Sequence, residues 1–182
     1  MNKFLQIVWE LVKIGAIALL IVIPIRQFVF QPFIVRGASM EPNFEDFDYL
    51  IINEISYRFD DPDRGDVVIF DSPMNSSQRF IKRIIGLPGE TVTIQSGEIA
   101  IKTESKTITL NEDMYLPTST VTSNSGPTVL GEDEYFVMGD NRQYSYDSRI
   151  FGAVKRNTII GKVALRFSIG GVFARNLFQI AQ

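Results

Sequence analysis

The sequence predicts a mainly β protein, an antiparallel sandwich or barrel-like domain preceded by one N-terminal transmembrane helix. Three observations support this fold class. A long apolar run lies within residues 1–30, the remaining chain alternates short β-type runs with turn residues, and no convincing amphipathic helix follows residue 30. Many short strands without intervening helices are typical of a sandwich or a barrel.

The N-terminal segment MNKFLQIVWELVKIGAIALLIVIPIRQFVF predicts a membrane anchor. Ile14–Ile25 carries no charged residue, and the span from Val8 to Phe30 reaches the roughly 20 residues that a spanning helix needs. Lys13 and Arg26 can extend their charges toward the interfaces. A buried core helix and a cleaved signal peptide are the alternatives, although bulky residues follow the run where a cleavage site needs small ones. The basic residues before the run weakly favour a cytoplasmic N-terminus.

The chain is predicted to divide at residue 30. Residues 1–30 are expected to form a cytoplasmic stub and the anchor, and residues 31–182 an extracytoplasmic all-β domain. Within that domain, about residues 95–135 are expected to form a smaller excursion of hairpin and loop, with Pro117–Thr128 as a flexible surface loop. The expected strands are Phe33–Val35, Asp48–Asn53, Asp66–Phe70, Arg79–Ile85, Thr91–Gln95, Glu98–Lys102, Lys106–Leu110, Glu134–Met138 and Ile159–Phe167.

Two missing residue types narrow the chemistry that the chain can perform. The absence of cysteine excludes a disulfide scaffold, a thiol nucleophile and a cysteine-type zinc site. The absence of histidine removes the usual general base and a common metal ligand. The net charge of −3 and the scatter of the basic residues argue against nucleic acid as a partner. We therefore expect no cofactor, no metal and no nucleic acid.

The segment RGASMEPNF, which follows the apolar run, contains Ser39 as a candidate nucleophile. A serine nucleophile needs a group that accepts its proton. Arginine stays charged at ordinary pH, so the available nitrogen bases are the seven lysines. Five of them lie in the anchor, beside a hairpin turn or in a turn-like segment, which leaves Lys82 and Lys162.

Lys82 lies in the segment RFIKRIIGLPGE. Strand alternation places its side chain on the face shared by Phe80 and Ile84, with Arg83 on the other face. A lysine held among apolar side chains loses hydration, and its lowered pKa allows a neutral amine near pH 7. An ordinary edge-strand lysine is the alternative. Lys162, in GKVALRF, is expected to be better solvated.

A third polar segment, MGDNRQYSYDSR at residues 138–149, begins where the core-type strand Tyr135–Met138 ends. Paired acids and arginines at the end of a buried strand would suit a rigid, hydrogen-bonded platform. A set of solvated turns is the alternative. The charged residues of this segment are Asp140, Arg142, Asp147 and Arg149.

Together, the three segments resemble the signature boxes of the bacterial type I signal peptidases, or leader peptidases, a family of serine proteases with a Ser-Lys dyad. The matching stretches are S-M-E-P at 39–42, R-F-I-K-R-I-I-G-L-P-G-E at 79–90, and G-D-N-R-x-x-S-x-D-S-R at 139–149. They stand in the family's order behind an N-terminal anchor, and the resemblance covers essentially the whole chain. The first box alone would be weak, because self-cleaving repressors share G-x-S-M-x-P.

The resemblance implies that Ser39 is the nucleophile and Lys82 its general base. Ser145 would hydrogen-bond to the lysine amine and orient it, and the backbone N–H of Ser39 would supply one oxyanion-hole donor. Gly37 stands where some family members have a serine that supplies a second donor. Asp140, Arg142, Asp147 and Arg149 would form the platform around the dyad.

The resemblance also implies a membrane-anchored serine endopeptidase that removes N-terminal signal peptides from exported pre-proteins. It would cleave after small residues in an Ala-x-Ala-like pattern, with the substrate bound as an added strand. Its partners would be pre-proteins emerging from the secretion machinery and membrane lipid. Its location would be the bacterial plasma membrane, in a single pass, with the catalytic domain on the outer face. The segment Phe28–Val35, with Phe44 and Phe47, is expected to dip into the interface.

Three other functions are compatible with parts of the sequence. A self-cleaving Ser-Lys repressor would need an N-terminal DNA-binding helix-turn-helix, where this chain has an apolar segment. A non-enzymatic membrane-anchored β domain would be favoured by the loss of Ser39 or Lys82, and both are present. A related peptidase dedicated to one substrate is the third.

Overall fold

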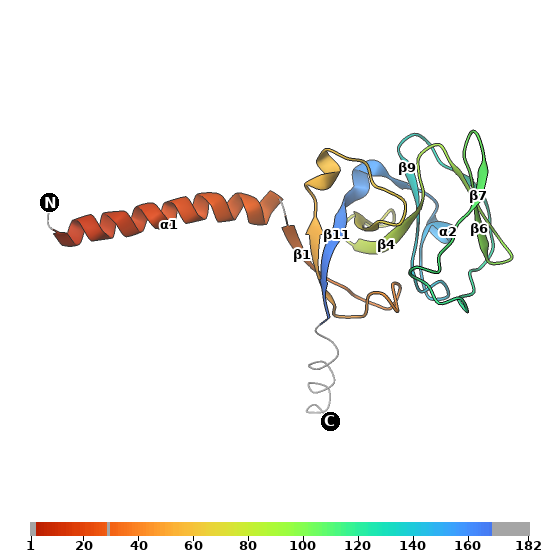
Figure 1. Ribbon diagram of the computed structural model, residues 1–182, viewed down its shortest axis with the longest axis horizontal. Coiled ribbons are helices and arrows are strands. Elements are labelled where there is room, and N and C mark those ends of the chain that lie inside the picture. The colour runs from red at the N-terminus through yellow and green to blue at the C-terminus, as the bar shows by residue number, and fades with distance from the viewer. Residues whose placement is uncertain (1–2, 29, 169–182) are drawn as a thin grey trace, which may run out of the picture.

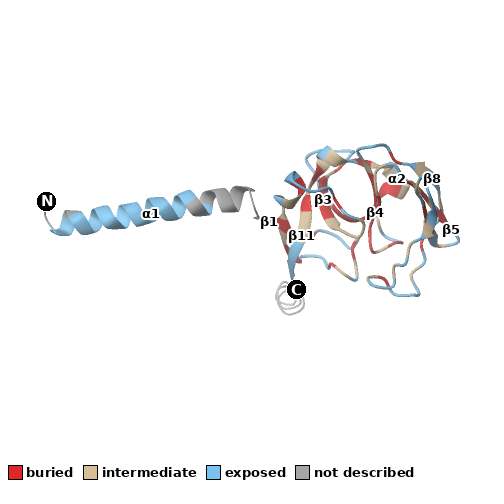
Figure 2. Ribbon diagram, turned by 45° about the horizontal axis from the view of Figure 1, so that its top comes forward, coloured by how far each residue is buried: buried red, intermediate tan, exposed pale blue. Residues whose placement is uncertain are grey.

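The computed structural model describes residues 3–28 and 30–168 (Figure 1). A long helix, α1 (Lys3–Phe28), leads into a domain built of antiparallel strands with only short helical segments. The predicted mainly antiparallel β fold is confirmed, and its strands form two sheets. The apolar side chains described on α1 are exposed, Leu20 to 74% (Figure 2). Among the residues described, no helix combines the length and the apolarity that a membrane crossing requires.

The larger sheet curls on itself. Its strand order is β1-β2-β11-β3-β4-β9-β10, and every pairing in it is antiparallel. Three strands separate β1 from β4 in this order, yet Gln31 Oε1 and Arg79 Nη1 lie 3.5 Å apart. The two strands therefore face one another across the curl. The strands are β1 (Phe30–Ile34), β2 (Tyr49–Asn53), β3 (Val67–Asp71), β4 (Arg79–Gly86), β9 (Glu134–Met138), β10 (Val154–Lys155) and β11 (Ile159–Phe167).

The smaller sheet has four strands in the order β7-β6-β5-β8. Strands β5 and β6 form a hairpin whose two turn residues, Ser96 (φ 53°) and Gly97 (φ 85°), both take left-handed backbone conformations. Such a turn matches the right-handed twist of the strands that it joins. The members are β5 (Thr91–Gln95), β6 (Glu98–Lys102), β7 (Thr107–Thr109) and β8 (Ser125–Val129).

Every strand expected from the sequence is present, four of them with the expected bounds. The structure adds two strands that the sequence analysis did not predict. Strand β8 lies partly inside the predicted flexible loop, because the open edge of β5 offers it a pairing partner. Strand β10 lies in a segment predicted as a turn and pairs with β9. The short helices were also not predicted: α2 (Ser148–Phe151) and 3₁₀ turns at Ser56–Arg58 and Arg156–Thr158.

Three clusters of buried apolar side chains form the core, and one of them fixes the segment that follows β1. In this cluster Val35 and Met40 are 1% and 0% exposed and pack with Leu50 and Ile81. Phe44 belongs to the same cluster at 9% exposure, so the prediction that it dips into a membrane interface is wrong. The ring of Phe44 packs with Val35 and Met40 in the core, a contact that the local sequence pattern does not indicate.

Candidate active site

Ser39 lies in the loop of residues 36–43, which we call the nucleophile loop. Buried Val35 and Met40 hold the loop at both sides of the serine. Within it, Glu41 N donates to Ala38 O, and Phe44 N, directly after the loop, donates to Met40 O at 2.9 Å. Gly37 takes a φ of 86°, which a residue with a side chain would adopt only at a cost. The loop is thus a folded turn that holds Ser39 on the rigid core.

The side chains of Ser39 and Lys82 meet, although they are 43 residues apart. The Nζ atom of Lys82 donates a hydrogen bond of 2.7 Å to Ser39 Oγ and another of 2.8 Å to the carbonyl of Ile81. Lys82 lies in the middle of β4 and is only 3% exposed. The residues predicted as nucleophile and base are therefore placed within hydrogen-bond distance of one another.

The surroundings of Lys82 lower its pKa from 10.5 to about 8. Burial is the main cause, because it disfavours the charged amine, and the nearby charges of Asp147 and Asp140 act in the opposite direction. The centre of the Phe80 ring lies 5.6 Å from Nζ, so this aromatic side chain is one of the groups that surround the buried amine. The neutral amine is therefore a minor form at pH 7, still far more abundant than for a lysine with a pKa of 10.5, and it predominates above about pH 8.

Gly139 joins the nucleophile loop to the third box, residues 139–149. A Cβ atom at this position would lie 2.2 Å from Ser145 Oγ and 2.3 Å from the carbonyl oxygen of Ser39. Asn141 continues the contact, because its backbone N–H donates to Ser39 O at 3.1 Å and its side chain to Ala38 O at 3.0 Å. Only a glycine at 139 allows the two loops to approach this closely.

Ser145 lies next to the dyad, but the predicted hydrogen bond between it and Lys82 is not formed. Its Oγ is buried and has no hydrogen-bond partner among the described residues. The hydroxyl is close enough to Asp147 to help lower the pKa of that carboxyl, yet the contact lacks hydrogen-bond geometry. Ser145 is thus an unpaired hydroxyl across Gly139 from Ser39.

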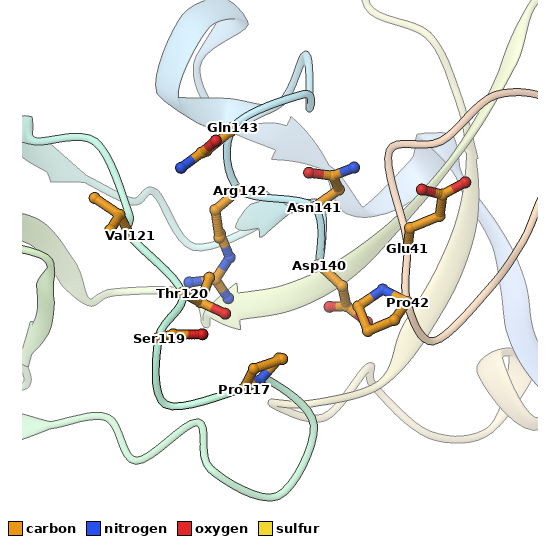
Figure 3. Close-up of a pocket in the computed structure, with 10 residues that line it drawn as sticks. All are labelled: Glu41, Pro42, Pro117, Ser119, Thr120, Val121, Asp140, Asn141, Arg142 and Gln143. Atoms are coloured by element: carbon orange, nitrogen blue, oxygen red, sulfur yellow. The ribbon is translucent and has the colours of Figure 1, made fainter.

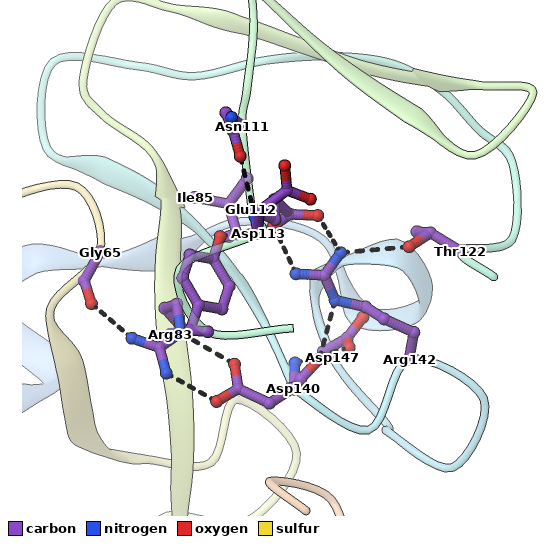
Figure 4. A network of polar contacts seen from close by, with 12 residues as sticks. Gly65, Arg83, Ile85, Asn111, Glu112, Asp113, Thr122, Asp140, Arg142 and Asp147 are labelled. Atoms are coloured by element: carbon purple, nitrogen blue, oxygen red, sulfur yellow. Dashed lines mark hydrogen bonds and ion pairs between the residues drawn. The ribbon is translucent and has the colours of Figure 1, made fainter. Parts of the chain in front are cut away.

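The four charged residues of the third box form ion pairs, two of them with residues outside the box, Arg83 and Glu112 (Figure 4). Asp147 and Arg149 pair within the box at 2.7 Å. Asp140 accepts two hydrogen bonds from Arg83 at 2.8 and 2.6 Å, and both Nη atoms of Arg142 reach Glu112 at 2.5 Å. The box is therefore tied to β4 and to the segment after β7.

Sequence reasoning missed three residues of this network. Arg83 could have been found, because strand alternation puts it opposite Lys82 on β4, where a buried arginine needs an acid. Glu112 offered no local signal, since its partner lies 30 residues away. Asn43 donates to Asp140 Oδ2 at 2.8 Å and to Tyr115 O at 2.7 Å, and so links the nucleophile loop to the same network.

Asp147 is fully buried and occupies the N-cap of α2. Burial alone would raise the pKa of its carboxyl, but hydrogen bonds from Arg149 and from the backbone N–H of Gly139 lower it below the ordinary value. Asp147 therefore stays ionised. It holds the Gly139 backbone in place with a fixed negative charge.

The dyad opens into a cavity of about 360 Å³ between β1 and β4. Its walls include Phe33 and Ile34 from β1 and Phe80 and Ile81 from β4. In the described part of the chain, β1 pairs only with β2, and β9 pairs with β4 only from Arg83 to Gly86. Strand β1 and the first half of β4 therefore each keep a free edge along this cavity.

Two further features bear on the chemistry. The backbone N–H of Ser39 donates no hydrogen bond within residues 3–28 and 30–168, so it is free to meet a bound oxygen. Over the same ranges, no group of three or more acidic side chains is arranged to hold a metal ion.

Comparisons with known proteins identify the family of the chain. The family model described as signal peptidase, peptidase S26, matches residues 8–168, which include Ser39, Lys82 and the third box. The chain belongs to the signal peptidase family. The resemblance predicted from the three boxes is thereby confirmed.

Relatives in this signal peptidase family match most of the chain. It is 37% identical over 163 residues to the probable signal peptidase I-2 of Synechocystis sp., a match that covers 87% of this chain and 72% of that protein. It is 32% identical over 158 residues to signal peptidase I V of Bacillus subtilis, a match that covers 82% of this chain and 93% of that protein. A crystal structure of a signal peptidase I from Enterococcus faecalis V583 is 34% identical, with a TM-score of 0.47 over 57% of this chain and 97% of that chain.

Proposed function

We propose that this signal peptidase is a serine endopeptidase that hydrolyses the bond between a signal peptide and the mature part of an exported pre-protein. Ser39 is the nucleophile and Lys82 the general base. The 2.7 Å contact between Lys82 Nζ and Ser39 Oγ, made by a lysine that is 3% exposed, supports this assignment. A nucleophile and a base within hydrogen-bond reach are what covalent catalysis by serine requires.

The steps follow from this contact. The neutral amine of Lys82 takes the Oγ proton while Oγ attacks the scissile carbonyl carbon, which forms a tetrahedral intermediate. The N–H of Ser39 stabilises its oxyanion. As the C–N bond breaks, the Lys82 ammonium gives its proton to the leaving amine. A water then loses a proton to Lys82 and attacks the acyl-enzyme. As the ester bond to Ser39 Oγ breaks, the Lys82 ammonium returns that proton to Oγ, which releases the signal peptide with a free carboxyl group and restores neutral Lys82 and Ser39.

We assign the third box a positioning role. Asp140, Arg142, Asp147 and Arg149 are engaged in ion pairs, so they support the dyad rather than exchange protons with substrate. Ser145 keeps an unpaired hydroxyl beside the dyad. We propose that it accepts an N–H of Lys82 when a substrate is bound, and so aims the lone pair of the amine at Ser39.

We propose that the substrate binds as an added strand between the free edges of β1 and β4. Main-chain hydrogen bonds to such edges give affinity without sequence, and side-chain pockets give specificity. The cavity of about 360 Å³ between these edges ends at the dyad. The preference for small residues, in an Ala-x-Ala-like pattern, is taken from the family resemblance.

We propose that residues 1–30 form a cytoplasmic stub and a single-pass anchor in the bacterial plasma membrane. Residues 31–182 would form the peptidase domain on the outer face, with about residues 95–135 as an excursion from it. The uncharged run Ile14–Ile25 and the exposed apolar side chains of α1 support this anchor, because a large exposed apolar surface needs an apolar partner. Pre-proteins leaving the secretion machinery would be held in the same bilayer, which raises their effective concentration.

The proposal is tested with the full-length protein in detergent and a precursor that carries a signal peptide. Mass spectrometry of the product gives the new N-terminus. We expect a single cut after a small residue, and no cut by the Ser39→Ala variant. A cut that persists in Ser39→Ala, or an unprocessed precursor, would reject the proposal.

A further inference from the structure

A second cavity, of about 300 Å³, adjoins the nucleophile loop (Figure 3). It is lined by residues 41–42 of that loop, by residues 140–143 of the third box, and by residues 117 and 119–121 of the loop between β7 and β8. The volume lies at the lower end of the range for ligand pockets. It includes neither Ser39 nor Lys82, which line the cavity between β1 and β4.

The floor of this second cavity is rigid. Asp140 and Arg142 are 2% and 3% exposed, and their charges are matched by Arg83 and Glu112. The opposite loop is held between buried Leu116 and buried Thr122, and the Thr122 hydroxyl accepts a hydrogen bond of 3.1 Å from Arg142. The cavity is therefore shaped by fixed, neutralised groups.

Polar groups without a charge partner stand at its rim. The Glu41 carboxylate has no ion pair within the part of the chain that the structure describes, and the Asn141 amide lines the same cavity (Figure 3). Ser119 is exposed on the other side of the cavity. One unmatched negative charge with amide and hydroxyl groups suits a polar or basic side chain and repels an acidic one.

The course of the substrate points to this cavity. The signal peptide precedes the scissile bond and shares the bilayer with α1, which runs into β1 at the wall of the dyad cavity. Residues before the bond therefore lie along β1, and those after it leave past Ser39 toward the far side of the nucleophile loop. An extended peptide advances about 3.3 Å per residue. Glu41 and Pro42 line the second cavity and follow Ser39 by only two and three positions, so the wall of the cavity lies within the reach of a few extended residues from the scissile bond.

We propose that this second cavity binds the first residues of the mature chain, after the scissile bond, and that Glu41 disfavours acidic side chains there. This inference rests on the proposed function and extends it. The enzyme would then select its cleavage site from both sides of the bond.

The test uses full-length enzyme and peptides identical up to the scissile bond. One set continues for several residues, with Asp, Asn or Lys at the second position after the bond. A short substrate carries only a p-nitroanilide leaving group there, and so reports the dyad without the second cavity. The variants are Glu41→Gln, Glu41→Lys and Ser119→Trp. Thr118→Trp is the matched control, because Thr118 lines a different cavity.

In the wild type we expect kcat/KM to be about two- to fivefold higher with Lys than with Asp, the scale of one exposed charge pair. Glu41→Gln should remove this preference, and Glu41→Lys should reverse it. Ser119→Trp should lower the long-to-short ratio of kcat/KM at least tenfold, while Thr118→Trp leaves that ratio unchanged. Equal rates for all three peptides in every variant would overturn the cavity assignment. Failure to cleave even the short substrate would instead reject the dyad and the proposed function.

Discussion

The amine of Lys82 lies 2.7 Å from the hydroxyl of Ser39 and is 3% exposed. At this distance the direction of the hydrogen bond depends on protonation. The ammonium can only donate to Ser39 Oγ, whereas the neutral amine can accept the Oγ–H. Catalysis requires the second form, so the protonation of one buried lysine controls the activity of the site.

The first prediction concerns pH. Because burial lowers the pKa of Lys82 to about 8, the active neutral form is scarce below that pH and predominates above it. We expect kcat/KM to rise tenfold per pH unit on the acid side and to level off above about pH 8. A pH profile with the short substrate measures this. A profile that levels off below pH 6.5 would contradict a lysine base.

The second prediction separates activity from stability at Lys82. Lys82→Met should lower kcat by at least the 10²–10⁴-fold that loss of a general base costs. The same change should stabilise the domain, because a lysine whose pKa falls from 10.5 to about 8 opposes folding while it is charged. Each tenfold weakening of proton binding corresponds to about 1.36 kcal/mol, so the gain in the free energy of unfolding is up to about 3 kcal/mol below pH 8.

The gain in stability should shrink as the pH rises from 8 to 10.5 and both states lose the proton. Thermal unfolding at pH 6 and pH 10 tests the trend. Lys162→Met is the control, since Lys162 lies 3.8 Å from Asp66 at a partly exposed site and should keep near-normal activity. If Lys82→Met retained more than a tenth of the wild-type rate, the dyad assignment would be wrong.

The parts of the fold that depend on local pattern were predictable. Strands β5, β6, β9 and β11 have the bounds that alternation and turn residues predicted. Strand β8 was not predictable, because its sequence SGPTV contains Gly and Pro and it forms only against β5, more than 25 residues earlier. The curl that brings β1 and β4 together also has no local signal.

The same distinction holds for the site. Ser39 and Lys82 could be proposed because the chain has no histidine or cysteine and few suitable lysines. The ion pairs could not, since Arg83 and Asp140 are 57 residues apart. The sequence analysis grouped the four charged residues of the third box as one platform around the dyad and named no partners outside it, whereas Asp140 and Arg142 pair with Arg83 and Glu112. The types of residue in the chain indicate which side chains can act as nucleophile and base. The ion-pair partners of the third box depend on which strands the folded sheet brings together.

The third prediction concerns Asp147, whose charge raises the pKa of Lys82. Asp147→Asn should shift the acid limb of the pH profile to lower pH, because the ammonium loses an attractive charge. It should also destabilise the domain by about 3–5 kcal/mol, since Arg149 keeps a side chain that is only 6% exposed without its acid. Activity and thermal unfolding as functions of pH check both effects. A shift of the limb to higher pH would contradict the electrostatic account.

The fourth prediction concerns Gly139. In Gly139→Ala the new methyl would lie 2.3 Å from Ser39 O, so the nucleophile loop must move. We expect kcat to fall at least tenfold, because a displaced Ser39 hydroxyl no longer keeps its hydrogen-bond distance and orientation to Lys82. Gly126→Ala is the matched control, as no atom lies within 4 Å of its added methyl. Equal kcat values for the two variants would show that the approach of the loops is unimportant.

The last prediction concerns Ser145. Its Oγ is buried without a hydrogen-bond partner among the described residues, and it lies across Gly139 from Ser39. A buried hydroxyl without a partner costs stability, so a residue serving only the fold would not be held this way. If Ser145 orients the Lys82 amine during catalysis, Ser145→Ala should lower kcat by about 10- to 1,000-fold and still leave more activity than Lys82→Met. The melting temperature should stay the same or rise, because an unsatisfied group is removed. A serine that merely caps its own loop would behave in the opposite way, with a lower melting temperature and a kcat within about twofold of the wild type. That second outcome would remove Ser145 from the active site.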